Sequence, residues 1–204
     1  VVATAEIRVP VTTANLIESK SLKLYLGSFA MTAFRRPGDV RDAIARDLSG
    51  CAGGPVDVSL NTDTAVAVLD GQCIDLLEVE CSHWEVDAGL LRADAGEIVK
   101  ESLHSHLLRS LCPVTGQPDM GSLQVTYSGP KIDPAALLRY IVSFREHNDF
   151  HEACVERMFV DITERCHPEK LSVYARYQRR GGIDINPFRS NVASRPGNPR
   201  LWRQ

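Results

Sequence analysis

The second half of the chain carries an ordered series of secondary-structure signals that few folds can accommodate. Residues 97–111 and 122–128 alternate apolar and polar side chains, as strands do, on either side of a Pro/Gly turn. Residues 133–166 have a helical pattern, with an expected break at the sequence His-Asn-Asp. The run "KLSVYARYQRRGGIDINPFRS" then places Gly-Gly between two alternating stretches, which is a strong hairpin signal. The predicted order is therefore strand, strand, helix, helix, strand, strand.

The first half of the chain shows a shorter version of the same plan. Residues 4–12 and 21–29 alternate like two paired strands. Pro37 then opens a predicted helix whose apolar residues recur at four-residue spacing. Residues 55–61 resemble a further strand, and residues 63–95 are less regular. We interpret the irregular stretch as a connector.

Antiparallel strands with helices on one face form an α+β layer. The free edges and the exposed face of such a sheet are usually paired or covered. We therefore expect two modules, residues 1–95 with the connector and residues 96–204, closed by a second subunit in a homodimer. The chain has no initiating Met and opens in strand-like sequence, so we expect the first module to be incomplete at its start.

Composition and cysteine usage limit the classes of function. The net charge of −3 gives no global electrostatic case for binding nucleic acid or an anionic membrane. No run approaches the roughly 18 apolar residues of a membrane span, and no signal peptide is visible. The six cysteines contain no CxxC pair and are irregularly spaced, which favours reduced thiols in the cytoplasm. We expect most of them to be buried.

The turn between the two long predicted strands, "CPVTGQPDMGS", contains the first candidate chemistry. Cys112 stands at a strand end, where its sulfur can point into a cleft. A thiolate is a strong nucleophile if its pKa is lowered or a base is near. The turn can bring Asp119 back toward the sulfur, to take the thiol proton and pass it to a substrate atom. The same pattern also fits a buried cysteine and an aspartate that bonds its own turn.

Two other polar clusters allow more than one interpretation. His147 and His151 are four residues apart on a predicted helix, which is metal-ligand spacing, but a polar helix face explains them equally well. Glu18, Lys20 and Ser21 lie at the start of a predicted strand, either as a polar pocket or as solvated charge. No GxGxxG or GxxxxGK[ST] motif is present, so a nucleotide would have to bind outside the usual Gly-rich loops.

Four stretches together resemble one family, the NADPH-dependent 7-cyano-7-deazaguanine reductases of queuosine biosynthesis, in their long two-module form. These stretches are "IESKSLKLYLGSF", "CPVTGQPDMGSLQVTYSG", "YIVSFREHNDFHEACVERMF" and "KLSVYARYQRRGGIDINPFRSN", in that order. The resemblance implies tandem tunnelling-fold modules with sites at subunit interfaces. It implies reduction of a nitrile to a primary amine with two NADPH. The implied substrate is a small 7-deazaguanine in a tRNA-modification pathway, with no direct contact to nucleic acid or membrane.

The resemblance also assigns roles to residues. By resemblance, Cys112 is the nucleophile that forms a covalent thioimide with the nitrile carbon, and Asp119 is the proton donor. Three segments carry the binding residues. Substrate contacts are expected from Ile17, Glu18, Ser19, His151 and Glu152, and NADPH contacts from Ser19, Lys20, Arg180 and Gly181. The resemblance assigns no metal ligand.

Two other functions stay open on the sequence. One is a zinc-dependent cyclohydrolase of the same fold, with ligands among His147, His151, Cys112 and Cys154. The Lys-rich segment "ESKSLKLY" would have no role in such an enzyme. The other is a non-catalytic module that keeps the purine site. The presence of Cys112, Asp119 and Glu152 argues against this alternative.

Overall fold

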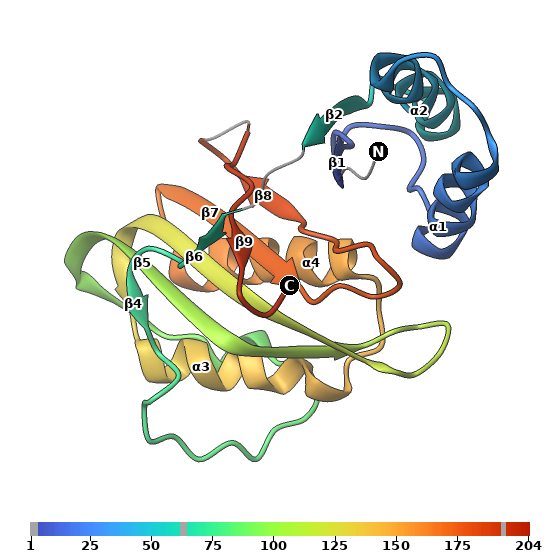
Figure 1. The fold of residues 1–204 in the computed structure, drawn as a ribbon. Helices are drawn as coiled ribbons and strands as arrows, with labels where there is room; N and C mark the ends of the chain where they lie inside the picture. Colours follow the sequence, from blue (N-terminus) through green and yellow to red (C-terminus); the bar gives the residue numbers. More distant parts are fainter. Residues whose placement is uncertain (1–3, 62–64, 193–194) are drawn as a thin grey trace. The chain divides into compact units, whose positions relative to one another are not determined.

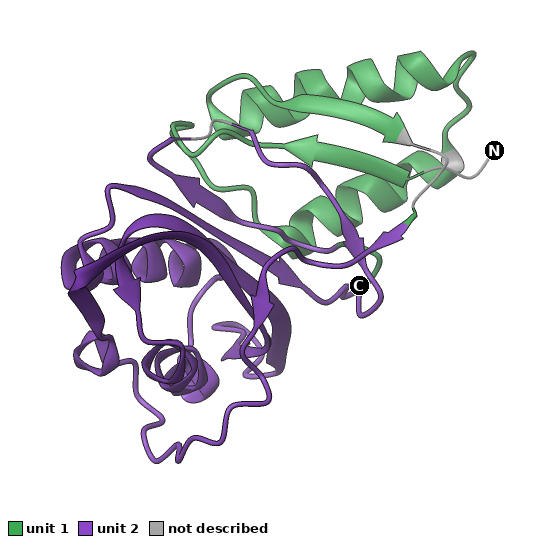
Figure 2. Ribbon diagram, turned by 90° about the vertical axis from the view of Figure 1, so that its left-hand side faces the viewer, with its two compact units in different colours: residues 1–65, 181–183 green, residues 66–180, 184–204 purple. Residues whose placement is uncertain are grey.

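The computed structural model describes residues 4–61, 65–192 and 195–204. The chain divides into two compact units, which are drawn in different colours in Figure 2. Unit 1 comprises residues 1–65 and 181–183, and unit 2 comprises residues 66–180 and 184–204. The first division falls at residue 65, and the residues predicted as a connector lie almost entirely in unit 2. The module boundary expected at residue 95 stays a prediction. No helix among the described residues has the length and apolar character that crossing a membrane requires.

The described residues of unit 1 form two strands and two α-helices in the order strand, helix, helix, strand. Its elements are β1 (Thr4–Arg8), α1 (Ser19–Ser28), η1 (Phe29–Met31), α2 (Pro37–Ala52) and β2 (Asp57–Asn61). β1 and β2 pair antiparallel, with Ile7 opposite Val58. The predicted helix from Pro37 is confirmed, and Gly53 ends it in the left-handed conformation with φ 70°.

The prediction of a strand at residues 21–29 is wrong, because this segment forms α1. Leu22, Tyr25, Leu26 and Phe29 pack against the core of unit 1, at the i, i+3, i+4, i+7 spacing of one helix face. Leu24, which the alternating pattern would place beside Leu22 and Leu26, is 77% exposed.

Unit 2 is built on a five-stranded sheet with the order β4-β5-β6-β7-β8 (Figure 1). Its strands are β3 (Val66–Ala67), β4 (Gln72–Cys73), β5 (Ala93–Leu111), β6 (Pro118–Ile132), β7 (Lys170–Tyr177), β8 (Phe188–Ser190) and β9 (Arg200–Leu201). Its helices are η2 (Ala88–Leu90), α3 (Pro134–Ser143), η3 (Phe144–Glu146) and α4 (His151–Cys166). β4 runs parallel to β5, the pairs from β5 to β8 are antiparallel, and β3 pairs separately with β9.

The order of elements from β5 to β8 confirms the prediction of strand, strand, helix, helix, strand, strand. Side chains of α3, α4 and one face of the sheet form a single core, which includes Leu123, Tyr140 and Met158. The α+β class, with an antiparallel sheet and paired helices on one face, is therefore confirmed. The connector packs on the same core through partly buried residues such as Val79 and Val86.

The Gly-Gly turn is present, but the hairpin around it is looser than predicted. Gly181 and Gly182 have φ values of 62° and 89°, as the two central residues of a type I′ turn require. Strand pairing resumes only at Tyr174 opposite Phe188. Pro187 accepts a bond from Ala175 but has no N–H to return one, which interrupts the ladder.

Candidate active site

The turn that joins β5 to β6 holds Cys112 in a fixed loop. The backbone N–H of Cys112 donates to Gln117 O at 2.9 Å, and Gly116 N–H donates to Cys112 O at 2.8 Å. Gly116 has φ 66°, a conformation that glycine adopts without strain. The preceding residue is tied to the segment between η3 and α4, because Leu111 N–H donates to His147 O at 2.8 Å. The thiol therefore stands on a rigid strand end, as the sequence predicted.

The environment of Cys112 favours the thiolate. Burial raises the pKa of the thiol, but hydrogen bonds from the Thr115 hydroxyl, the backbone N–H groups of Val114 and Thr115, and Arg180 outweigh it. Together they lower the pKa to about 7 from an ordinary value of 9.0. At pH 7 about half of the molecules then carry Cys112 as a thiolate, which is the form that acts as a nucleophile. By contrast, burial raises the pKa of Cys154 and Cys166 to about 11.

The expectation that most cysteines are buried is wrong. Only Cys154 and Cys166 are buried, whereas Cys51 and Cys73 are exposed, and Cys81 and Cys112 are partly exposed. All six are free thiols.

Asp119 lies near the start of β6 and is 4% exposed. Its Oδ1 forms an ion pair with Arg180 Nη1, and its Oδ2 lies 3.2 Å from His151 Nε2. That imidazole nitrogen is buried and has no aligned hydrogen-bond partner within the described residues. Asp119 is therefore a buried carboxylate between a cation and an imidazole, and the interpretation as a turn residue that bonds its own backbone does not describe it.

Arg180 connects the nucleophile to this carboxylate. It bonds the Asp119 carboxylate and also bonds the Cys112 sulfur. Its Nη2 donates to Gln117 Oε1 at 2.6 Å and to Thr115 Oγ1 at 3.4 Å. Sequence reasoning missed Thr115 and Gln117, although both stand in the Pro/Gly turn that drew attention to Cys112. The Arg180 guanidinium therefore contacts both ends of that turn, Cys112 and Asp119.

The first turn of α4 supplies the other predicted substrate residues of unit 2. The ring of His151 packs on that of Tyr177 with centroids 4.0 Å apart. Burial lowers the pKa of His151, whereas the carboxylates of Asp119 and Glu152 raise it. The effect of burial is larger, so the imidazole is neutral at pH 7. The Glu152 carboxylate accepts no hydrogen bond and forms no ion pair in the described part of the chain, so it is available to a ligand.

The predicted residues of the other segment lie in unit 1, at the N-terminus of α1. Glu18 is the N-cap of this helix and accepts bonds from Lys20 N at 2.8 Å and Ser21 N at 2.7 Å. These bonds lower the pKa of Glu18. Ile17, Ser19 and Lys20 therefore surround a helix start and not the mouth of a strand. Their approach to the residues of unit 2 stays a prediction.

Comparisons with known proteins bear on both units. A family model described as "QueF-like protein" matches residues 118–196, and one described as "Nitrile reductase, 7-cyano-7-deazaguanine-reductase N-term" matches residues 1–60. The curated NADPH-dependent 7-cyano-7-deazaguanine reductase of Azoarcus sp. (strain BH72) is 57% identical over 196 residues. That alignment covers 94% of this chain and 69% of the relative. The chain belongs to the 7-cyano-7-deazaguanine reductase family.

A solved structure is also similar in part. The crystal structure of the archaeosine synthase QueF-Like in the apo form matches 50% of this chain and 98% of its own, with a TM-score of 0.41 and 14% identity. Membership of the reductase family rests on the sequence matches alone.

The structure does not assemble the metal site that the cyclohydrolase alternative requires. His147 follows η3, whereas His151 begins α4, so the two histidines are not four residues apart on one helix as the sequence suggested. Among the described residues, the group of His, Cys, Asp and Glu side chains close enough to share an ion comprises Cys73, His104 and His106. None of the four predicted zinc ligands belongs to it.

Proposed function

We propose that this protein is an NADPH-dependent nitrile reductase that converts 7-cyano-7-deazaguanine to 7-aminomethyl-7-deazaguanine. Family membership supports the reaction. The observation that carries the residue assignment is Arg180, whose guanidinium bonds both a thiol with its pKa lowered to about 7 and the buried carboxylate of Asp119. A nucleophile and a proton-transfer group on one cation are the elements that addition to a nitrile needs.

In the proposed first step the Cys112 thiolate attacks the nitrile carbon. The sulfur lone pair forms the new C–S bond, one π pair of the C≡N triple bond moves to nitrogen, and the nitrogen takes a proton from Asp119, which has accepted the thiol proton. The product is a thioimide, whose C=N carbon accepts a hydride more readily than the nitrile does. Arg180 holds the thiolate and the carboxylate together before the attack.

Two reductions complete the proposed reaction. NADPH, when bound, supplies one hydride to carbon in each of them, so that two NADPH are consumed. The first hydride, with a proton taken up by nitrogen, gives a thiohemiaminal; departure of the Cys112 thiolate leaves a protonated imine, and the second hydride gives the amine. The imine would hydrolyse in water, so the residues around Cys112 must exclude water during exchange of the cofactor.

Base recognition is assigned to the first turn of α4. A 7-deazaguanine presents a ring N–H and an exocyclic amino group side by side, and one carboxylate can accept from both. Glu152 has a carboxylate without a protein partner in the described residues, which supports this role. The neutral ring of His151, held against Tyr177, offers a neighbouring surface and a polar nitrogen.

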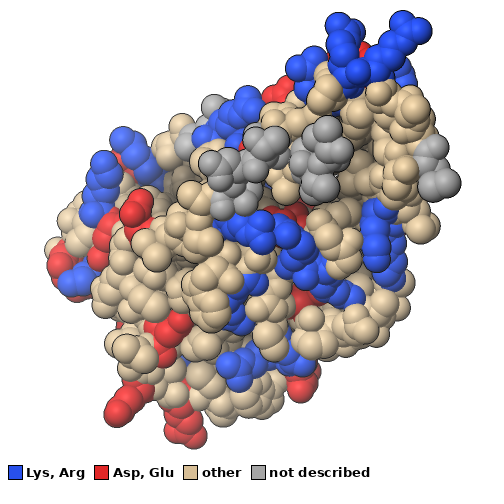
Figure 3. All heavy atoms as spheres, in the orientation of Figure 1, with Lys and Arg blue, Asp and Glu red and all other residues tan. Residues whose placement is uncertain are grey.

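The residues proposed to hold NADPH fit a phosphorylated ligand. The side chain of Arg180 is 37% exposed and that of Arg179 34% exposed, beside the turn at Gly181. Lys20 is exposed in unit 1. On the face shown in Figure 3, Lys and Arg side chains are interspersed with Asp and Glu. We further propose a homodimer, and the cytoplasm as its location, where a catalytic thiol stays reduced.

The test is NADPH oxidation with 7-cyano-7-deazaguanine as the only added substrate. We expect two NADPH oxidised for each amine formed, and a covalent adduct on the Cys112 peptide when NADPH is omitted. Cys112→Ala should show neither, while Cys51→Ser, an exposed cysteine of unit 1, should show both. NADPH oxidation without an adduct would refute the thioimide, and absence of both from the wild-type protein would refute the proposed function.

A further inference from the structure

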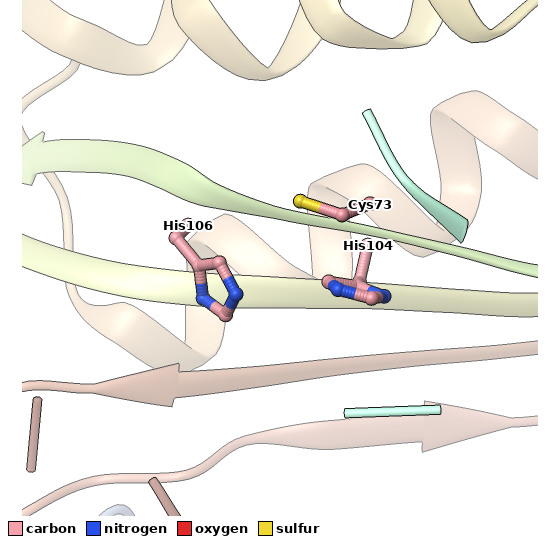
Figure 4. Close-up of side chains that lie close together, drawn as sticks. All are labelled: Cys73, His104 and His106. Atoms are coloured by element: carbon pink, nitrogen blue, oxygen red, sulfur yellow. The ribbon is translucent and has the colours of Figure 1, made fainter. Parts of the chain in front are cut away.

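Three side chains outside the proposed active site form a cluster with metal-ligand chemistry. Cys73 lies on β4, and His104 and His106 lie two residues apart on β5. A ligand atom from each lies within 4.8 Å of the other two. Figure 4 shows the sulfur and the two imidazole rings close together. None of the three takes part in the proposed reaction.

The backbone holds Cys73 firmly beside His104. The two residues are paired in the parallel ladder of β4 and β5, and Ile74 N–H donates to His104 O at 2.9 Å. Ile74 is fully buried in the core. Gly71, with φ +95°, lets β4 approach this closely, because a Cβ there would lie 2.2 Å from Ser102 O. The position of the thiol is therefore set by the fold although its side chain is exposed.

His104 supplies an independent sign of a missing ligand. The residue is 7% exposed, and its Nδ1 is buried without a hydrogen-bond partner among the described residues. Burying a polar nitrogen without a partner is unfavourable, so proteins rarely leave one without a role. A bound cation would satisfy a nitrogen in this position.

His106 is oriented as metal-binding histidines are. Its Nδ1 lies 2.7 Å from Ser122 Oγ, which fixes the ring and leaves Nε2 for an ion. The Asp75 carboxylate accepts the backbone N–H of His106 at 3.0 Å and 3.2 Å, adding negative charge nearby.

We propose that Cys73, His104 and His106 bind a transition-metal ion of the Zn²⁺ class, with water completing the coordination. One thiolate and two imidazoles are the donors that Zn²⁺ prefers, and neither Mg²⁺ nor Ca²⁺ takes such a set. The ion joins the connector to β5, so its role is to stabilise unit 2. This site is separate from the proposed active site and does not depend on the proposed function.

Cobalt provides a probe with a spectroscopic signature. The full chain, freed of metal with a chelator, is titrated with Co²⁺, and the absorbance of thiolate-to-cobalt charge transfer is followed. We expect one saturating equivalent in the wild-type protein and in Cys51→Ser and Cys112→Ala. We expect loss of the band in Cys73→Ser, and at least tenfold weaker binding in His106→Gln. With Zn²⁺ at a hundred times its dissociation constant, the melting temperature should rise by about 5–10 °C.

Other outcomes overturn the proposal. A band that survives in Cys73→Ser, or that disappears in Cys112→Ala, would place the ion on a different thiol. Failure of the wild-type protein to bind Co²⁺ saturably would also refute the site. Alkylation of wild-type Cys73 gives a readout that needs no variant: Zn²⁺ should slow it at least tenfold and leave Cys51 unchanged, and equal rates with and without Zn²⁺ would refute the site.

Discussion

The lowered pKa of Cys112 can be tested through a single hydroxyl group. Among the groups that lower this pKa, the Thr115 side chain contributes most. Thr115 is exposed, so Thr115→Val removes the hydroxyl at nearly constant volume without disturbing the core. Thr115→Ser is the matched control, because it keeps the hydroxyl and removes only a methyl group.

The expected size of the effect follows from the free energy of one hydrogen bond. A bond worth about 0.5–1.5 kcal/mol, divided by 1.36 kcal/mol per pKa unit, raises the pKa of Cys112 by about 0.4–1.1. The pKa then moves from about 7 to about 7.4–8.1, and the thiolate fraction at pH 7 falls from about half to about 7–28%. The loss of thiolate alone should slow alkylation at pH 7 by about two- to sevenfold. The greater nucleophilicity of a more basic thiolate partly offsets this decrease.

The assay is the rate of alkylation of the Cys112 peptide by iodoacetamide, measured by mass spectrometry at several pH values. The wild-type protein and Thr115→Ser should share a midpoint near pH 7, and Thr115→Val should have its midpoint at higher pH. Because both thiols are almost fully ionised at about pH 9, Thr115→Val should react there at least as fast as the wild-type protein. Coincident profiles for Thr115→Val and the wild-type protein would falsify the claim that this hydroxyl stabilises the thiolate.

Three further predictions concern the remaining groups of the proposed site. Asp119→Asn should lower the rate of NADPH oxidation by roughly 10²–10⁴-fold through loss of proton transfer, and normal turnover would show that Asp119 has no such role. Glu152→Gln should weaken binding of the nitrile by roughly tenfold to several hundredfold, from about 1.5–3 kcal/mol, with NADPH binding nearly unchanged; calorimetry in the Cys112→Ala background measures this without adduct formation, and equal affinities would exclude Glu152 from base recognition. Changing Lys20 and Arg180 together to Ala should raise the KM for NADPH far more than that for NADH, because only NADPH carries the extra phosphate. Since Arg180 also bonds Cys112, Lys20→Ala alone is the control, and equal effects on both cofactors would show that these cations contact something else.

Much of unit 2 could be predicted from the sequence, because its signals are long and mutually consistent. The alternating runs on either side of Cys112 became β5 and β6, and the break at His147 separates η3 from α4. The Gly181-Gly182 pair adopts the positive φ values that the motif indicates. The resemblance identified the family and picked out Cys112, whose pKa the structure places at about 7.

Short apolar runs were less informative, because seven or eight residues can satisfy two periodicities at once. In residues 21–29 the alternating leucines predicted a strand, but the same segment also contains an i, i+3, i+4, i+7 stripe. The segment forms a helix because that stripe packs on the core of unit 1 and because Glu18 caps the helix N-terminus. The free energy that separates the two conformations lies in contacts with the core formed by α2 and Val56, which local sequence does not contain.

Contacts between distant residues were decided by the tertiary structure alone. Arg180 reaches Asp119 and Cys112 only because β6 and β7 are neighbours in one sheet. Cys73 meets His104 only because Gly71 lets the connector pair with β5. Sequence determines which side chains are present and which local conformations they favour. Burial and long-range pairing determine which of those side chains share a hydrogen bond, a charge or an ion.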